Sequence, residues 1–163
     1  MASVAPKINI HVIPIEPTPW RRAGIYGKRF FDLQASLKKK IINCFNSPEA
    51  LLSNKPLHLV MLFLMKIPKS LSKKKKLELN GKPHKKAPDL SNMIKFIEDT
   101  FNKYIWEDDR LISKISAEKR YSHISATAFS VVPHVPESPV NIEELNKEML
   151  KVALAKCPDS QSL

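Results

Sequence analysis

The sequence predicts an α/β fold, an α+β sandwich in which helices pack on a small mixed β-sheet. Three observations favour this class. Segments with strand and helix patterns follow in the order strand, helix, strand, helix, strand, strand, the run Leu57 to Lys66 is typical of a buried strand, and a C-terminal helical pattern follows. With 163 residues and 43% hydrophobic content, the chain can form one domain with a core, and it is too short for two comfortable ones.

The first elements are a strand and a helix. Residues 8–15 alternate in polarity and end at two prolines, which indicates a strand. Residues 29–46 place Phe30, Leu33 and Ile41 on one helical side, which predicts the first helix. In the loop between them, Trp20 stands beside two arginines, where it either fills the core or stacks on an unpaired base.

A central strand and a basic segment follow. The apolar run from Leu57 to Lys66 is too short for a typical helix and predicts a strand buried on both faces. Residues 67–87 are predicted to be a long basic loop, since eight lysines between Lys69 and Lys86 face a single acidic residue, Glu78. Such a run is either a solvated loop or a surface for a polyanion. The acidic residues next to it favour a loop that orders on DNA.

The next helix has a clear start. Asp89 follows Pro88 and occupies the position of an N-cap, so we expect a helix from about Leu90, with an apolar stripe that includes Ile97 and Phe101. An acidic turn then precedes two alternating runs, residues 111–121 and 124–132, which predict a hairpin.

Three prolines mark the end of a domain predicted to span residues 1–132. Residues 133–163 then form a proline-rich linker, a helix over 141–156 and a loose tail. An amphipathic helix of this length needs a surface to bury its apolar side. We expect it to pack on its own domain, and the alternative is a partner chain.

The acidic residues suggest a chemistry. Asp89 and Asp109 stand at the ends of separate elements, beside Lys95 and the basic segment. Cleavage of a phosphodiester with a divalent metal needs oxygen ligands for the ion and cations for the phosphate. The structural alternative is that Asp89 only caps its helix, Asp108 and Asp109 belong to a turn, and Lys95 pairs with a nearby carboxylate, Asp99.

Composition excludes several other classes. The net charge of +11 and the pI near 9.7 favour a polyanionic partner. Two cysteines and five histidines show no zinc-ligand spacing, and the three glycines form no phosphate-binding loop, so no nucleotide cofactor is expected. No apolar run is long enough for a membrane span, so we expect a soluble protein of the cytoplasm with no membrane partner.

The motifs in this chain resemble those of the RusA-type Holliday junction resolvases, or crossover junction endodeoxyribonucleases, which are common in phages and prophages. The resemblance covers about residues 7 to 132. The segments that carry it are PKSLSKKKK (68–76), GKPH (81–84), PDLSNMIK (88–95), Asp108-Asp109 and KRY (119–121). Several motifs in the same order are far more specific than any single one.

The resemblance implies a RusA-like fold, Mg²⁺ as the cofactor, branched DNA such as four-way junctions as the partner, a homodimer, and a bacterial or phage-infected cell. Asp89, Lys95 and Asp109 match the metal-binding and catalytic positions. The predicted DNA-binding residues, from charge and from the resemblance together, are Lys69, Lys73, Lys74, Lys75, Lys76, Lys82, His84, Lys85, Lys86, Lys119 and Arg120.

The chain departs from the family pattern at one position. Ser91 stands where the family usually carries its second aspartate, and a hydroxyl is a poorer ligand for a hard cation. Glu98, two helical turns further on the same face, is our predicted substitute metal ligand, with Asp108 as a further helper. The alternative is that Glu98 pairs with a neighbouring cation, such as Lys103 or a lysine of the loop.

The sequence therefore predicts a Mg²⁺-dependent, structure-selective endodeoxyribonuclease that resolves Holliday junctions and other branched DNA in recombination and repair. The first alternative is a relative that binds branched DNA without cutting it, because Ser91 has disabled the site. The second is a basic RNA-binding or scaffold protein.

Overall fold

The computed structural model describes residues 8–45, 52 and 54–157. The chain divides into two compact units. The first comprises segments 1–16, 56–84 and 112–163, and the second comprises segments 17–55 and 85–111. Apart from Cys157, the predicted tail lies outside the described residues.

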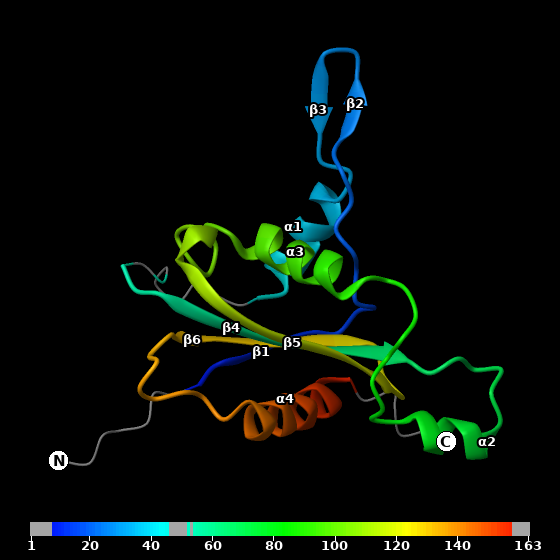
Figure 1. Ribbon diagram of the computed structural model, residues 1–163. Coiled ribbons are helices and arrows are strands. Elements are labelled where there is room, and N and C mark those ends of the chain that lie inside the picture. The colour runs from blue at the N-terminus through cyan, green and yellow to red at the C-terminus, as the bar shows by residue number, and fades with distance from the viewer. Residues whose placement is uncertain (1–7, 46–51, 53, 158–163) are drawn as a thin grey trace. The chain divides into compact units, whose positions relative to one another are not determined.

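A mixed four-stranded sheet forms the first unit. Its strands are β1 (Ile10–Ile13), β4 (Leu57–Lys66), β5 (Ile112–Ser122) and β6 (Ala126–Pro133). They lie in the order β1-β6-β4-β5, with β4 parallel to β5 and the other neighbours antiparallel (Figure 1). The predicted fold class is confirmed, although β1 is shorter than the run predicted over residues 8–15.

The β4 strand has neighbours on both sides. Every residue from Leu57 to Met65 is buried, and Leu59 pairs with Ile115 of β5 on one edge and with Val131 of β6 on the other. A strand that is apolar on both faces is stable only where both faces are covered. The predicted central strand is therefore confirmed.

The predicted hairpin between residues 111–121 and 124–132 is wrong. Both segments are strands, but β4 lies between them, so β5 and β6 do not pair. Alternating polarity along a sequence indicates a strand, but it does not show which strands pair with each other. The apolar β4 takes an interior position, where its two apolar faces are buried.

The helix α4 (Ile142–Lys156) covers one face of this sheet (Figure 1). Asn141 caps it by accepting a hydrogen bond from the Glu144 backbone nitrogen. Leu145, Met149 and Ala153 are buried in a cluster with apolar residues of β1, β4 and β6. The expectation that this helix packs on its own chain is therefore confirmed. Burial of each large side chain contributes about 1.5–3 kcal/mol.

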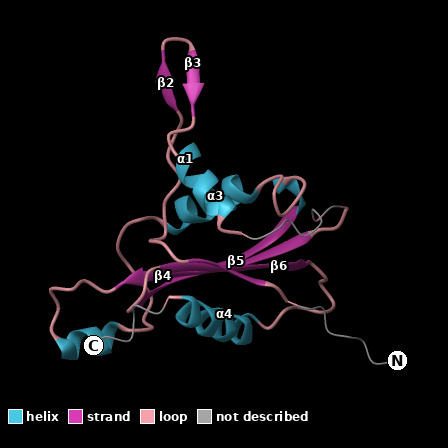
Figure 2. Ribbon diagram, turned by 180° about the vertical axis from the view of Figure 1, so that it is seen from behind, coloured by secondary structure: helices cyan, strands magenta, loops and turns pink. Residues whose placement is uncertain are grey.

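The predicted loop over residues 67–87 contains a short helix, which corrects the prediction. The helix α2 (Lys73–Leu79) follows the end of β4 (Figure 2). Ser72 caps it by accepting a hydrogen bond from the Lys75 backbone nitrogen at 3.4 Å. Lysine is a good helix former, and none of the residues of α2 is buried, so charge alone did not reveal the helix.

The second unit contains a hairpin and two packed helices, α1 (Ala35–Asn43) and α3 (Leu90–Phe101). The predicted helix over residues 29–46 is wrong at its start, because β3 (Arg29–Phe31) pairs with β2 (Gly24–Tyr26). Gly27 makes the turn with φ of 59°, which glycine adopts without steric cost. The helix α1 begins at Ala35, after a turn in which the Asp32 carboxylate accepts a hydrogen bond from the Gln34 backbone nitrogen.

The helix α3 begins where it was predicted to begin, at Leu90 after Asp89. Its buried face is rotated relative to the predicted stripe. Ile97 and Phe101 are buried as expected, together with Met93 and Phe96, which the stripe did not include. Polar residues at the other positions of the helix carry the site described below.

Candidate active site

Asp89 lies at the N-cap of α3. Its backbone is extended, with φ of −67° and ψ of 137°, as N-cap residues usually are. The residue is exposed, and its side chain makes no cap hydrogen bond. The backbone therefore takes the capping conformation, while the carboxylate oxygens stay available to another ligand.

Lys95 is held against an aromatic ring. Its Nζ atom lies 3.8 Å from the centre of the Trp20 ring, and the Trp20 backbone nitrogen donates to the Asn92 carbonyl oxygen at 2.8 Å. The Trp20 backbone is thus tied to α3, and its indole orients Lys95 through a cation–π interaction. Asp99, the alternative partner of Lys95, lies 3.8 Å from Lys38 Nζ instead.

Glu98 is a half-buried carboxylate in a negative environment. Burial raises the pKa of Glu98, the carboxylates of Asp109 and Asp99 raise it further, and Lys95 lowers it. Asp109 therefore lies close enough to act on Glu98. Among the described ion pairs none joins Glu98 to Lys103, a cation that the alternative assigned to it.

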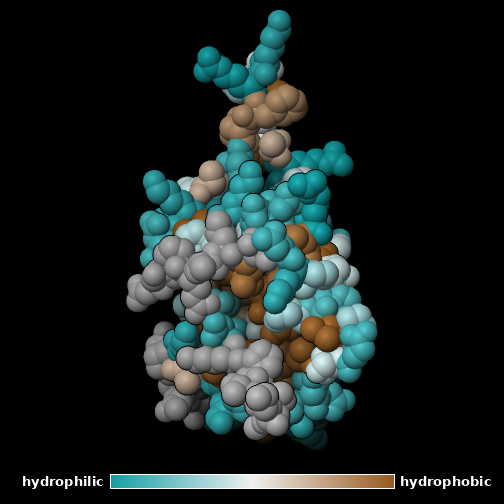
Figure 3. All heavy atoms as spheres, turned by 90° about the vertical axis from the view of Figure 1, so that its left-hand side faces the viewer, coloured by the Kyte–Doolittle hydropathy of each residue, from teal (hydrophilic) through white to brown (hydrophobic). Residues whose placement is uncertain are grey.

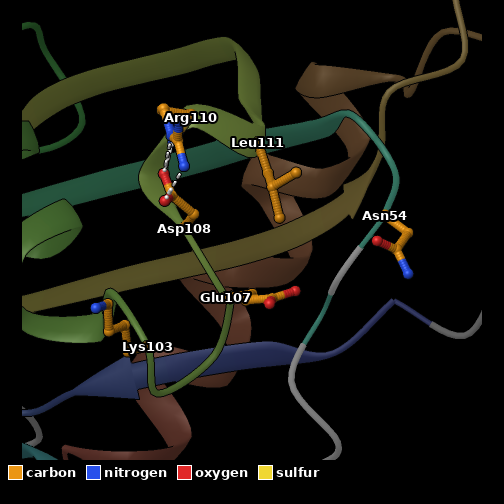
Figure 4. A pocket seen from close by; sticks show the side chains of 6 residues that line it. All are labelled: Asn54, Lys103, Glu107, Asp108, Arg110 and Leu111. Carbon is orange, nitrogen blue, oxygen red and sulfur yellow. Dashed lines mark hydrogen bonds and ion pairs between the residues drawn. The ribbon is translucent and has the colours of Figure 1, made fainter.

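Asp108 is engaged by Arg110. Its Oδ1 atom accepts hydrogen bonds from the backbone nitrogen and Nε of Arg110, and its Oδ2 atom accepts one from Nη2, each at 2.9 Å (Figure 4). These bonds hold the pKa of Asp108 well below its usual range. A metal ion would have to share this carboxylate with the guanidinium group.

The same pair lines an open pocket of about 530 Å³ in the second unit. Figure 4 shows the Arg110 side chain folded over Asp108, with Glu107 and Lys103 on the neighbouring turn. The pocket is lined by Asn54, Lys103, Glu107, Asp108, Arg110 and Leu111. It contains only one of the four predicted metal ligands, Asp108, so it does not represent the predicted site.

The lysines of α2 form an exposed basic surface. Lys73, Lys74 and Lys75 are exposed and Lys76 is partly exposed, while Lys69 is exposed in the loop before them. None of these lysines takes part in an ion pair with a residue that the structure describes. Their charge is therefore available to a polyanion.

A second basic group lies along the outer edge of β5. Residues 81–84 pair with this strand, since the Tyr121 nitrogen donates to the Lys82 oxygen and the His84 nitrogen donates to the Lys119 oxygen, both at 2.9 Å. The structure thus brings Lys82 and His84 next to Lys119 and Arg120. Lys85 and Lys86, the next residues in the chain, are exposed and belong to the second unit.

Arg120 is partly neutralised by its own strand. Its Nη2 atom lies 2.6 Å from Glu118 Oε1, and the same oxygen accepts a hydrogen bond from Asn146 of α4 at 2.6 Å. The C-terminal helix therefore helps to fix a predicted DNA contact.

Comparison with known families shows the family of the chain. The family Endodeoxyribonuclease RusA matches residues 14–131, more than half of the chain. The chain belongs to the RusA endodeoxyribonuclease family. The family is one of Holliday junction resolvases, which are metal-dependent nucleases acting on branched DNA. No curated protein matches the chain.

The RusA match ends before α4, so the packing of that helix on the sheet is a feature outside the matched region. The match contains every predicted site residue, from Lys69 to Arg120. In the part of the chain that the structure describes, no helix has the length and apolarity needed to cross a membrane.

The side chains present are of the chemical type that a RusA metal site needs, but they are not arranged as a preformed metal site. Within residues 8–45, 52 and 54–157, no group of three His, Cys, Asp or Glu side chains is arranged to hold a metal ion. Asp89 and Asp109 nevertheless supply the carboxylate oxygens that Mg²⁺ prefers. The mutual repulsion of Asp109 and Glu98 is what a bound cation would relieve. Ser91 is exposed on the first turn of α3.

Sequence reasoning missed two roles. It did not identify Arg110 as the partner of Asp108, although an arginine two residues after an aspartate in a turn is a usable signal. It offered Trp20 as a core residue or a base-stacking residue, and the structure gives it a third role, the orientation of Lys95.

Proposed function

We propose that this member of the RusA family cleaves Holliday junctions and other branched DNA by Mg²⁺-dependent phosphodiester hydrolysis. The observation that carries the proposal is the carboxylate of Asp89, which stands at the N-cap of α3 and makes no cap hydrogen bond. Its position in the RusA motif, six residues before Lys95, supports the assignment.

In this proposal, Asp89 and Asp109 hold the metal ion, and Glu98 replaces the ligand that is missing at Ser91. When bound, Mg²⁺ supplies charge neutralisation at the phosphate and an acidified water. Lys95, oriented by Trp20, donates to the phosphate oxygens on which negative charge develops. Asp108 stays paired with Arg110 and contributes as a helper.

The basic residues bind the DNA backbone. The lysines of α2, the segment 81–84 and the edge of β5 offer charge to phosphates without reading base sequence. A four-way junction has two equivalent strands to cut, so we propose that the chain acts as a homodimer with two active sites.

The second candidate function is binding of branched DNA without cleavage. Ser91 favours it, because the chain lacks one carboxylate of the family pattern. It shares the DNA-binding surfaces with the first candidate and differs only in chemistry.

Incubation of a synthetic four-way junction with the purified chain separates the two candidates. Paired nicks that require Mg²⁺ and disappear in Asp89→Asn support the nuclease. Tight binding without nicks, with cleavage that appears only in Ser91→Asp, supports the non-cleaving relative. Absence of any junction binding at low salt contradicts both.

A further inference from the structure

The hairpin formed by β2 and β3 exposes large apolar side chains. Ile25 is 66% exposed, Tyr26 83% and Phe30 75%. Figure 3 shows hydrophobic atoms on the hairpin, with hydrophilic atoms at its end. An isolated two-stranded hairpin is only marginally stable in water, and an exposed apolar patch on a monomer usually marks an interaction site.

The register of the hairpin places aromatic rings on both faces. Ile25 pairs with Phe30 on one face, while Tyr26 pairs with Arg29 on the other. Phe31 belongs to the second face and lies over Gly24, where any larger side chain would collide with its ring. Phe31 therefore packs partly on the hairpin itself and is 47% exposed, while Tyr26 and Phe30 are the more exposed rings.

The hairpin is also cationic. Lys28 and Arg29 lie at its turn, and Arg21 and Arg22 precede it. No ion pair joins any of these four residues to another described residue. The only acidic residue between positions 17 and 34 is Asp32, which is paired with Lys38 at 2.8 Å.

The exposed rings and the cations of the hairpin together indicate the kind of partner it binds. A second copy of the hairpin would bring its own Lys28 and Arg29 against these cations, which disfavours pairing of two hairpins. A nucleic acid offers phosphates to Lys28 and Arg29 and flat base surfaces to the rings of Tyr26 and Phe30. Aromatic rings stack on any base, provided that the base is unpaired or unstacked.

We propose that the β2–β3 hairpin is a wedge that stacks Tyr26 and Phe30 on unstacked bases at the branch point of a DNA junction. The proposal rests on the proposed function and deepens it, because it names how branched DNA is distinguished from a plain duplex. The lysine surfaces bind both forms of DNA, and the hairpin adds a contact that only the branch can provide. From the strength of base–aromatic stacking, each ring contributes about tenfold to the preference for a junction.

The test places 2-aminopurine, a fluorescent adenine analogue quenched by stacking, at the centre of a four-way junction, in each strand in turn. One of these positions lies opposite the bases that the rings would cover, and there the probe loses its stacked neighbour without gaining a ring. Binding is measured in EDTA, so that no strand is cut. The parent is expected to raise the fluorescence at the branch. The variant Tyr26→Ala/Phe30→Ala is expected to lose this rise and about 100-fold of the preference for junction over duplex, while its affinity for duplex is unchanged.

Two variants control for folding and for loss of apolar surface. Tyr26→Trp/Phe30→Trp keeps a stacking ring at each position and should behave like the parent. Leu154→Ala removes a side chain of α4 that is 43% exposed and should also leave the signal unchanged. Loss of the signal in either control overturns the proposal.

Two further results overturn it. The first is a Tyr26→Ala/Phe30→Ala protein that raises the fluorescence at the branch and prefers the junction over duplex as strongly as the parent does. The second is sedimentation in which the same variant turns a dimer into a monomer, which assigns the hairpin to a second copy. A parent that unstacks the branch but never cuts it in Mg²⁺ supports the wedge and contradicts the nuclease. A parent that cuts without unstacking supports the nuclease and contradicts the wedge.

Discussion

The Lys95 ammonium lies 3.8 Å from the centre of the Trp20 ring, and Trp20 is tied to the same helix through the Asn92 carbonyl. A lysine side chain is long and flexible, so the ring restricts where its charge is placed. In the proposed function, this makes Trp20 a positioning residue for the group that meets the phosphate.

We expect Trp20→Ala to lower the single-turnover cleavage rate about two- to fivefold, the value of a cation–π interaction of about 0.5–1 kcal/mol. Affinity for the junction should change little, and Trp20→Phe should restore most of the rate. Rapid-quench kinetics and a binding titration separate the two effects. A loss of affinity with an unchanged rate would mean that Trp20 contacts DNA and does not position Lys95.

The lysines of α2 should control the salt dependence of DNA binding. Alanine is a good helix former, so replacing Lys73, Lys74 and Lys75 with alanine keeps the helix and removes three exposed charges. The plot of log affinity against log salt should become shallower by about 0.9 for each lysine that contacts a phosphate. Lys147→Ala/Lys151→Ala on α4 is the control, and an equal change there would show a nonspecific effect of charge.

Glu98 should reduce the stability of the metal-free protein. A carboxyl whose pKa is raised in the folded state binds its proton more tightly there than in the unfolded chain. Stability is therefore lost as the pH rises from the ordinary value of 4.5 through the folded pKa, and at pH 7 the charged group is a net cost.

Glu98→Gln removes this charge, so in EDTA at pH 7 it should raise the melting temperature. Addition of Mg²⁺ should stabilise the parent more than the variant, because the variant has lost a ligand. Glu78→Gln on α2 is the control and should change neither quantity. A Glu98→Gln protein that melts below the parent in EDTA would contradict the repulsion between Glu98 and Asp109.

His58 should make the sheet sensitive to acid. The residue is 2% exposed on β4, and its Nε2 atom is hydrogen-bonded to the Ser116 hydroxyl at 2.9 Å. Burial lowers the pKa of His58, and the charges of Lys114 and His134 lower it further. The unfolded chain then binds a proton more readily than the folded protein, so stability present above pH 6.5 is lost as the pH falls below it.

Urea titrations at pH 8, 7, 6 and 5 should show this loss of the free energy of unfolding in the parent. In His58→Gln, the decline between pH 7 and pH 5 should be smaller, because the titrating group has gone. An identical decline in both proteins would assign the acid sensitivity to other groups.

The elements that sequence predicted best are those with a strong local pattern. The apolar run of β4 and the start of α3 at Leu90 are decided by neighbouring residues, so both are found where they were expected. The pairing of β5 and β6 is decided by β4, which is distant in sequence. The strand β3 depends on the turn at Gly27, and the apolar residues after that turn imitate the spacing of a helix.

In the candidate site, too, sequence indicates what neighbouring residues decide and misses what distant residues decide. The motif predicted the site residues and identified the family, because motifs are read along the chain. It could not show that Asp108 is engaged by Arg110, that Trp20 covers Lys95, or that Asp109 acts on Glu98. These relationships depend on how side chains lie in the folded second unit.

The measurement that tests the account most directly is the single-turnover cleavage of a four-way junction in Mg²⁺ by Glu98→Gln and by Glu98→Gln/Ser91→Asp. If Glu98 replaces the missing aspartate, the single variant loses cleavage while it still binds the junction, and the double variant recovers it. A Glu98→Gln protein that cuts at the parent rate would contradict the claim that Glu98 completes the site.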